Sequence, residues 1–250
     1  MDDTDSIRHD WLKIWSEHEG HRPAVTDGST LESWTYGELY QRAQAGAHHL
    51  KTFFNIQPGD RVLYVGQNNI SVISLFFALS RLGAILVPVN YRLTPQEMSF
   101  IFRNSEASLI ICDKQHEQLV FEGKKIASVD CGTLLLRDFS EATQGLSFFS
   151  AFQIKESDPA LIIYTSGTTG LPKGAMLSYR GLFWNAYSTS LRLNISQQDC
   201  AVIFLPLFHT GGWNVLTTPF FSRGGHVVLT EKFDGEQILN LSEKFKATLI

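Results

Sequence analysis

Apolar residues in this chain recur with a period near two in short runs and near four in longer ones, and the two patterns alternate along the sequence. A period of two is typical of strands, and a period near 3.6 is typical of helices. This alternation over most of the 250 residues predicts an α/β fold, in which helices connect the strands of a sheet. The length suffices for one large domain or two small ones with a sizeable core.

The predicted strands are short apolar runs bounded by loop-forming residues, and the predicted helices carry an apolar face. The strands are residues 24–26, 33–35, 61–66, 84–89, 108–112, 160–165, 175–177, 201–204 and 226–229. The helices are residues 10–19, 36–54, 70–82, 95–104, 179–193, 215–221 and 236–246. Helix 179–193 is expected to bury Leu182, Phe183, Ala186 and Leu193. Residues 131–152 show no clear pattern and are interpreted as a surface connection.

Residues 164–174, Tyr-Thr-Ser-Gly-Thr-Thr-Gly-Leu-Pro-Lys-Gly, gather hydroxyls, glycines and one lysine directly after a strand-like run. Glycines let the backbone approach a ligand and direct successive N–H groups into one concavity that binds an anion. The hydroxyls add donors, or a ligand for a metal. Lys173 adds a point charge that attracts a phosphate by about 4 kcal/mol at 4 Å with an effective dielectric near 20. The pattern predicts a polyphosphate site.

Two other interpretations of this loop are weaker. The Walker A loop requires Gly-Lys-Ser/Thr and an immediate helix, whereas here Leu-Pro separates Gly170 from Lys173 and Gly174 follows the lysine. The short apolar run 175–177 then predicts a strand, and Ser178 is expected to cap the next helix. A flexible Ser/Thr/Gly linker is the other alternative, but linkers seldom follow an apolar run such as residues 161–164.

Isolated histidines and aromatic residues have ordinary structural explanations. His209 follows the apolar run 204–208, and a lone histidine in that setting is more often a hydrogen-bonded core residue than a catalytic one. Trp213 is equally explained as a core aromatic. His48 and His49 are adjacent on a predicted helix and cannot face one metal together, so a surface position is expected.

Composition excludes several classes of protein. Hydrophobic content of 44% and charged content of 18% are ordinary for a globular enzyme. A net charge of −4 with scattered cations gives no electrostatic reason to bind nucleic acid. The acidic start of the chain differs from a secretory signal. Arg81, Gly83 and Pro88 divide the apolar stretch 70–89 into a helix and a strand, so no integral membrane segment is expected. Cys112, Cys131 and Cys200 are expected to be reduced, buried thiols of a cytoplasmic protein.

Three segments together resemble one known family. Residues 165–174 resemble the phosphate loop of the adenylate-forming superfamily, which includes acyl-CoA synthetases, adenylation domains and luciferases. Residues 82–94, Leu-Gly-Ala-Ile-Leu-Val-Pro-Val-Asn-Tyr-Arg-Leu-Thr, resemble the upstream core signature of these enzymes. Residues 205–212, Leu-Pro-Leu-Phe-His-Thr-Gly-Gly, resemble their Pro-x-Phe-His motif. The resemblance covers about residues 23–250.

The resemblance implies two stacked α/β subdomains of the large N-terminal domain of an acyl-CoA synthetase. One would comprise about residues 52–193, and the other residues 1–51 together with 200–250. Family members continue beyond this point with a Tyr-Gly-x-Thr-Glu segment, a ribose-binding aspartate, a hinge and a C-terminal lid domain that carries a lysine. We therefore expect that the chain is a fragment, incomplete at its C-terminus, which is inactive alone.

The resemblance also implies a reaction and its site residues. The parent enzyme would activate a carboxylic acid with ATP and Mg²⁺ to an acyl adenylate and then transfer the acyl group to coenzyme A. Lys173 and His209 are the candidate catalytic residues, and Thr165 is the candidate magnesium ligand. The candidate nucleotide-binding residues are Thr165, Ser166, Gly167, Thr168, Thr169, Gly170 and Lys173. The candidate substrate-binding residues are Phe208, His209, Gly211 and Trp213.

The acid and the acceptor are less closely specified. Trp213 resembles the aromatic gate of some long-chain acyl-CoA synthetases, which favours a medium- or long-chain fatty acid. Pro172-Lys173-Gly174 favours coenzyme A ligases over fatty acyl-AMP ligases. A peptide-synthetase adenylation domain stays an alternative, although Asn214 or Thr217 stands where its amino-binding aspartate is expected. A non-catalytic module that binds nucleotide or acyl groups is another alternative, and a homodimer is compatible with the resemblance.

Overall fold

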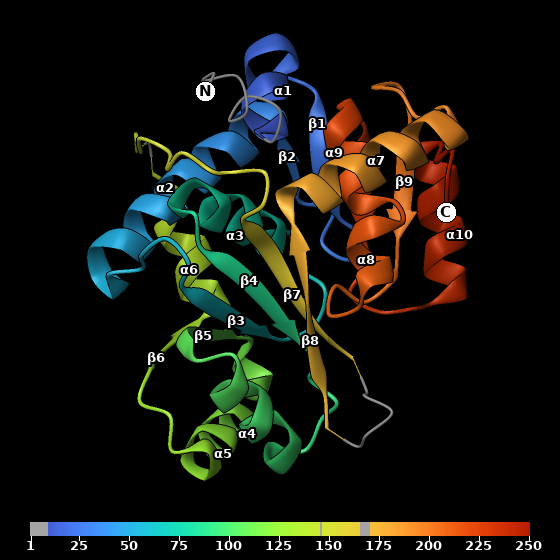
Figure 1. The fold of residues 1–250 in the computed structure, drawn as a ribbon. Coiled ribbons are helices and arrows are strands. Elements are labelled where there is room, and N and C mark those ends of the chain that lie inside the picture. Colours follow the sequence, from blue (N-terminus) through green and yellow to red (C-terminus); the bar gives the residue numbers. More distant parts are fainter. Residues whose placement is uncertain (1–9, 146, 166–170) are drawn as a thin grey trace.

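The chain folds into two β-sheets flanked by helices (Figure 1), which confirms the predicted α/β class. The structure is a computed structural model and describes residues 10–145, 147–165 and 171–250. The strands of each sheet come from different parts of the sequence. The four-stranded sheet takes its strands from the beginning and the end of the described chain, and the six-stranded sheet takes them from the middle.

The six-stranded sheet has the strand order β6-β5-β3-β4-β7-β8. Its strands are β3 (Arg61–Val65), β4 (Ile85–Val89), β5 (Ala107–Cys112), β6 (Gly132–Leu135), β7 (Pro159–Thr165) and β8 (Lys173–Ser178). Neighbouring strands are parallel except for β7 and β8, which form an antiparallel hairpin at one edge of the sheet.

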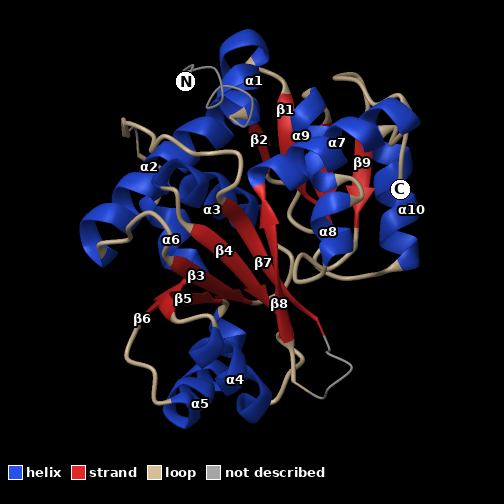
Figure 2. Cartoon of the chain, viewed as in Figure 1, coloured by secondary structure: helices blue, strands red, loops and turns tan. Residues whose placement is uncertain are grey.

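Helices cover both faces of this sheet, as Figure 2 shows. On one face lie α2 (Tyr36–Phe54), α3 (Ile70–Leu82) and α6 (Leu136–Ala142). On the other lie α4 (Pro95–Asn104) and α5 (Glu117–Ala127), which follows the short 3₁₀ helix η1 (Lys114–His116). Strand β3 shows why two layers form, because successive side chains point to opposite faces. Val62 and Tyr64 join the core beneath α2 and α3, while Leu63 and Val65 join the core beneath α4.

The four-stranded sheet has the order β2-β1-β10-β9. Its strands are β1 (Pro23–Asp27), β2 (Ser33–Thr35), β9 (Cys200–Ile203) and β10 (His226–Leu229). The nearby helices are α1 (Trp11–Glu19), α7 (Tyr179–Leu193), α8 (Thr210–Asn214), α9 (Thr217–Arg223) and α10 (Gly235–Phe245). Ala201 and Val227 belong to the same apolar core as Val62 and Leu86 of the other sheet. One continuous core therefore joins the two sheets.

Local signals explain where several helices begin and end. Thr35 and Glu38 form a reciprocal capping box at the start of α2, and Thr94 and Glu97 form another at the start of α4. Ser178 caps α7 as predicted, because its hydroxyl accepts a hydrogen bond from the backbone N–H of Gly181. The predicted bounds 36–54 and 70–82 agree with α2 and α3 residue for residue.

Three sequence-based expectations were wrong, and one helix was misplaced by two residues. Residues 131–152 contain strand β6 and helix α6 and are not simply a connection. The helix expected over 215–221 is α9, which begins and ends two residues later, and the short helix α8 before it was not expected. Leu193 is exposed, although Leu182 and Ala186 on the same helix are buried. Cys131 is half-buried, whereas Cys112 and Cys200 are buried free thiols as expected.

The subdomain boundaries stay a prediction. Within the described residues, no helix is both long and apolar enough to cross a membrane.

Candidate active site

Strands β7 and β8 bring Thr165 and Lys173 together at the loop end of their hairpin. Thr165 is the last residue of β7, Lys173 is the first of β8, and the two are Cα partners in the antiparallel register. Both residues are exposed. Figure 1 shows this end of the hairpin projecting beyond the other strands of the sheet. Ser166, Gly167, Thr168, Thr169 and Gly170, the other candidate nucleotide-binding residues, lie outside the described residues.

The two strands pack closely beside the Thr165–Lys173 pair. Gly174 is paired with Tyr164, and a Cβ atom at Gly174 would lie only 2.9 Å from the Ile162 Cγ2 atom. Only glycine lets the two strands approach this closely without displacing Ile162. The Tyr164 hydroxyl donates a hydrogen bond of 2.6 Å to Asn104 Oδ1 at the end of α4. The strand that precedes the loop is therefore anchored to a helix.

His209 lies in the loop that connects β9, a strand of the four-stranded sheet, to α8. It is the N-cap residue of α8, with extended backbone. Its N–H donates to the Pro206 carbonyl at 3.0 Å, and its own carbonyl accepts from the Gly212 N–H at 3.0 Å. The side chain is exposed, and its ring centroid lies 4.7 Å from that of Phe208. His209 is thus a surface residue on a well-bonded turn, which differs from the buried histidine of the structural alternative.

Asn68, which belongs to none of the predicted motifs, fixes the loop that carries His209. It follows β3 and is 8% exposed. Its amide nitrogen donates to the carbonyls of Leu205 at 3.0 Å and Thr230 at 3.1 Å, and its amide oxygen accepts from the Leu207 N–H at 2.9 Å. The Asn68 side chain, in the loop after strand β3 of the six-stranded sheet, therefore holds the segments that follow β9 and β10. The one local signal is a polar residue in the loop that follows a buried strand, three positions after β3 ends.

The two other family-like segments meet around a cavity between the sheets. The cavity is about 270 Å³ and is lined by residues that follow β3, β4, β9 and β10: Asn68, Tyr91, Arg92, Phe204, Leu205, Pro206, Glu231, Lys232 and Phe233. Phe208 lies beside it, because its ring packs edge-on against Tyr91 at 5.5 Å. Residues 82–94 and 205–212, which are far apart in sequence, thus converge at the carboxyl ends of parallel strands, where α/β folds bind ligands.

The structure separates the roles of the two glycines that follow His209. A Cβ atom at Gly212 would lie 2.3 Å from the Pro206 carbonyl oxygen, so glycine is required there for backbone packing. At Gly211 the nearest atom to an added Cβ would be Leu205 Cδ1 at 3.4 Å, an ordinary contact. Packing therefore explains Gly212 and leaves Gly211 without a structural requirement.

Trp213 lies in the interior. Its side chain is 1% exposed, its indole N–H donates to the Leu207 carbonyl at 2.6 Å, and its ring lies 4.9 Å from that of Phe76. This environment is what the core-aromatic alternative predicts. A role for Trp213 in substrate binding stays a prediction. Phe220 and Phe221 are also core residues, whereas Trp184 is 53% exposed.

Buried titratable groups elsewhere are held in their neutral forms. Burial raises the pKa of the Cys112 thiol to about 12 and that of Cys200 to about 11, so neither is a ready nucleophile. Burial lowers the pKa of His226 to about 4, and its Nε2 lies 2.8 Å from Thr26 Oγ1. Among the described residues, no group of three or more His, Cys, Asp or Glu side chains could hold a metal.

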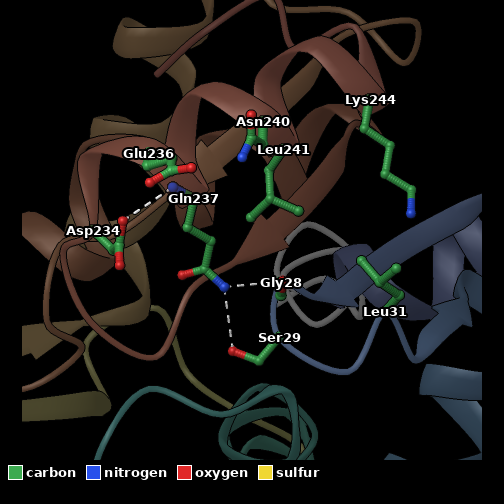
Figure 3. Close-up of a pocket in the computed structure, with 9 residues that line it drawn as sticks. All are labelled: Gly28, Ser29, Leu31, Asp234, Glu236, Gln237, Asn240, Leu241 and Lys244. Atoms are coloured by element: carbon green, nitrogen blue, oxygen red, sulfur yellow. Dashed lines mark hydrogen bonds between the residues drawn. The ribbon is translucent and has the colours of Figure 1, made fainter.

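A separate polar hollow lies between α10 and the turn after β1 (Figure 3). Gln237 spans it by donating to the Gly28 carbonyl at 3.1 Å and contacting Ser29 Oγ at 3.4 Å. None of the candidate site residues lines this hollow. Its open, polar character makes it a poor candidate for binding an apolar acid.

Comparison with known proteins identifies the family. A family model described as "AMP-binding enzyme" matches residues 12–250. The chain belongs to the AMP-binding enzyme family. This membership confirms the resemblance to adenylate-forming enzymes that the three motifs indicated.

Relatives in this family differ in their named substrates. A feruloyl-CoA synthase from Amycolatopsis sp is 32% identical over 230 residues, covering 92% of this chain and 45% of the relative. The fatty acid–[acyl-carrier-protein] ligase ScoC from Streptomyces coeruleorubidus is 32% identical over 239 residues, covering 90% of this chain and 44% of the relative. The ATP-bound structure of MatB from Rhodopseudomonas palustris has a TM-score of 0.83 at 26% identity, covering 94% of this chain and 48% of MatB. The chain thus spans about half the length of these relatives.

Proposed function

We propose that the protein containing this chain is an AMP-forming acid–thiol ligase, which activates a carboxylic acid with ATP and passes the acyl group to coenzyme A. The observation that carries this proposal is the pairing of Thr165 and Lys173 at the loop end of the β7–β8 hairpin. An exposed hydroxyl and an exposed ammonium thereby flank the glycine-rich segment predicted to bind phosphate. Family membership and the ATP-bound structural neighbour support the same proposal.

The reaction needs activation because a carboxylate is a poor electrophile. In the first step a carboxylate oxygen bonds to the α-phosphorus of ATP, the bond to the bridging oxygen breaks, and pyrophosphate leaves. In the second step the thiol sulfur of coenzyme A bonds to the acyl carbon, AMP leaves, and the thiol proton passes to solvent or a base. Negative charge builds on the departing pyrophosphate, and the Lys173 ammonium would stabilise it.

Thr165 and His209 would have supporting roles. The exposed hydroxyl of Thr165 can serve as one oxygen ligand for Mg²⁺, an ion that prefers oxygen ligands and usually keeps several from water and phosphate. No carboxylate cluster among the described residues competes for that role. His209, exposed beside Phe208, would face the carboxyl group of the acid, and Phe208 and Gly211 would contact its apolar body.

We propose that the acid is a medium- or long-chain fatty acid. The aromatic residues around His209 and a relative named as a fatty acid ligase support this choice. The feruloyl-CoA synthase relative makes an aromatic acid the alternative that has to be tested beside it.

The decisive experiment uses the full-length gene product that contains these residues. Pyrophosphate release is measured with octanoate, palmitate and ferulate, each with and without coenzyme A, and thioester formation is followed in parallel. We expect pyrophosphate release and acyl-CoA with octanoate or palmitate. Activity with ferulate alone would contradict the fatty acid proposal but not the ligase proposal. Pyrophosphate release without thioester would indicate an acyl-AMP ligase, and ATP binding without turnover of any acid would indicate a non-catalytic module.

A further inference from the structure

A partly open pocket of about 500 Å³ lies among the N-terminal helices and contains none of the candidate active-site residues. Its walls come from α1, α2, α3 and the segment 148–154, and they include Asp10, Ile14, Tyr40, Gln44, Arg81 and Phe148. This volume is within the range of small-molecule sites.

Arg81 lies in the wall of this cavity with an incomplete set of partners. Its side chain is 5% exposed. One terminal nitrogen donates to both carboxylate oxygens of Asp10, at 3.1 and 3.3 Å, and the guanidinium lies 4.4 Å from the centre of the Tyr40 ring. The Nε–H has no hydrogen-bond partner among the described residues. A buried donor without a partner costs about 1–3 kcal/mol, so the site favours a ligand that accepts from it.

Gln44 adds a second buried and unpaired group. The residue is 4% exposed, and its amide nitrogen lies 3.4 Å from the Tyr40 hydroxyl. Its amide oxygen has no partner among the described residues. Turning the amide by 180° exchanges which atom contacts Tyr40 but still leaves the other atom unpaired. Two independent polar groups that flank the same tyrosine therefore lack partners.

The charges in this wall favour a neutral ligand. Asp10 already neutralises Arg81, and Lys13 and Glu17 at the cavity form another pair at 3.9 Å. A carboxylate would therefore gain little net attraction while losing its hydration. A hydroxyl group can both accept a hydrogen bond from Arg81 and donate one to Gln44, and it carries no charge.

The rest of the cavity is suited to an aromatic body. Phe148 and Phe152 are 83% and 44% exposed, and both line the pocket together with the partly buried Phe149. The segment is attached to α3, because the Phe152 N–H donates to the Arg81 carbonyl at 2.7 Å. Aromatic rings attract one another in offset or edge-to-face arrangements, and a ligand ring would remove these exposed side chains from water.

We propose that this cavity binds a neutral phenol, with the hydroxyl between Arg81 and Gln44 and the ring against the phenylalanines of segment 148–154. The site needs neither ATP nor a carboxylic acid, so it stands or falls separately from the proposed ligase activity.

The test compares the binding of three probes that share a propyl-substituted benzene ring, measured by isothermal titration calorimetry at pH 7 with the full-length protein. They are 4-propylphenol, 4-propylanisole, which accepts but cannot donate, and propylbenzene, which does neither. We expect 4-propylphenol to bind at least tenfold more tightly than propylbenzene, with 4-propylanisole between them. Equal affinity for the three probes, or no binding of the phenol, would overturn the proposal and would indicate that water fills the polar end of the cavity.

Three variants locate the binding. Gln44→Leu preserves size and helix propensity, and should reduce the preference for the phenol over propylbenzene to less than threefold. Ile14→Trp should fill the cavity and abolish binding of all three probes. Gln118→Leu is the matched control, because Gln118 is exposed on α5, and should bind like the wild type. Circular dichroism and the melting temperature verify folding of each variant. Unchanged binding in both Gln44→Leu and Ile14→Trp would place the phenol elsewhere and refute the assignment.

Discussion

The Thr165–Lys173 pair at the loop end of the β7–β8 hairpin and the loop that carries His209 are held in place by different means. Thr165 and Lys173 are exposed and are positioned by the backbone pairing of two strands. The His209 loop is fixed from behind by the buried Asn68 amide and by the Trp213 indole, which bonds to Leu207. Buried side-chain hydrogen bonds therefore fix the His209 loop, whereas among the described residues only the pairing of the two strands positions Thr165 and Lys173.

This difference predicts which substitutions should impair catalysis at unchanged stability and which should first lower the stability of the fold. At the hairpin end, a side chain can be removed without opening a cavity, so its loss should affect catalysis alone. At the His209 loop, the supporting residues are buried and bonded, so their loss should affect stability first.

The largest effect is expected at the hairpin. Lys173→Ala in the full-length protein should lower the rate of pyrophosphate release by at least 100-fold, since removal of one donor that stabilises developing charge costs about 2.7–4 kcal/mol. The free energy of unfolding should change by less than about 0.5 kcal/mol, as for exposed residues generally. Lys155→Ala, at another exposed lysine, is the control and should alter neither quantity. A Lys173→Ala variant with wild-type pyrophosphate release would remove the hairpin from the proposed site.

A smaller effect, on stability, is expected at Asn68. Asn68→Ala leaves the Leu207 N–H and the carbonyls of Leu205 and Thr230 without the bonds that they now make. The free energy of unfolding measured by urea denaturation should fall by about 2–3 kcal/mol, as expected when buried polar groups lose partners. Asn240→Ala, at an exposed position of α10, should stay within about 0.5 kcal/mol of wild type. Equal stability of the two variants would show that the His209 loop is not held from behind.

The smallest effects are expected in the glycine pair after His209. Gly212→Ala should lower the free energy of unfolding by about 1–3 kcal/mol, because its Cβ would press on the Pro206 carbonyl. Gly211→Ala should leave it unchanged or raise it by up to about 1 kcal/mol, since alanine is favoured over glycine within a helix. Urea denaturation of both variants measures the contrast. Comparable losses in the two would mean that the loop tolerates no change and that packing alone explains both glycines.

The sequence was most informative where the controlling signals are local. The bounds of α2 follow from the Thr35–Glu38 capping box and from Asn55, which ends the helix in a left-handed conformation. Strand β6 was missed because it is a short, exposed strand at the sheet edge without an alternating pattern. Helix α8 was missed because it is only five residues long, whereas the helix predicted over 215–221 corresponds to α9 with a shift of two residues.

The candidate site was predictable in its motifs but not in its supports. Thr165 and Lys173 are near in sequence, and a hairpin was the natural connection between the predicted strands that contain them. Asn68 contacts carbonyls 137 and 162 residues away, and no local pattern encodes such contacts. The cavity bounded by Tyr91 and Pro206 likewise exists only because the two sheets pack together.

The three bonds of Asn68 also bear on how the chain unfolds. Because they join the end of β3 to segments beyond β9 and β10, separating the sheets has to break them together. Fluctuations that expose the Leu207 amide should therefore be sub-global openings and not local fraying. The residue that sets the position of His209 thereby also couples the two halves of the molecule into one cooperative unit.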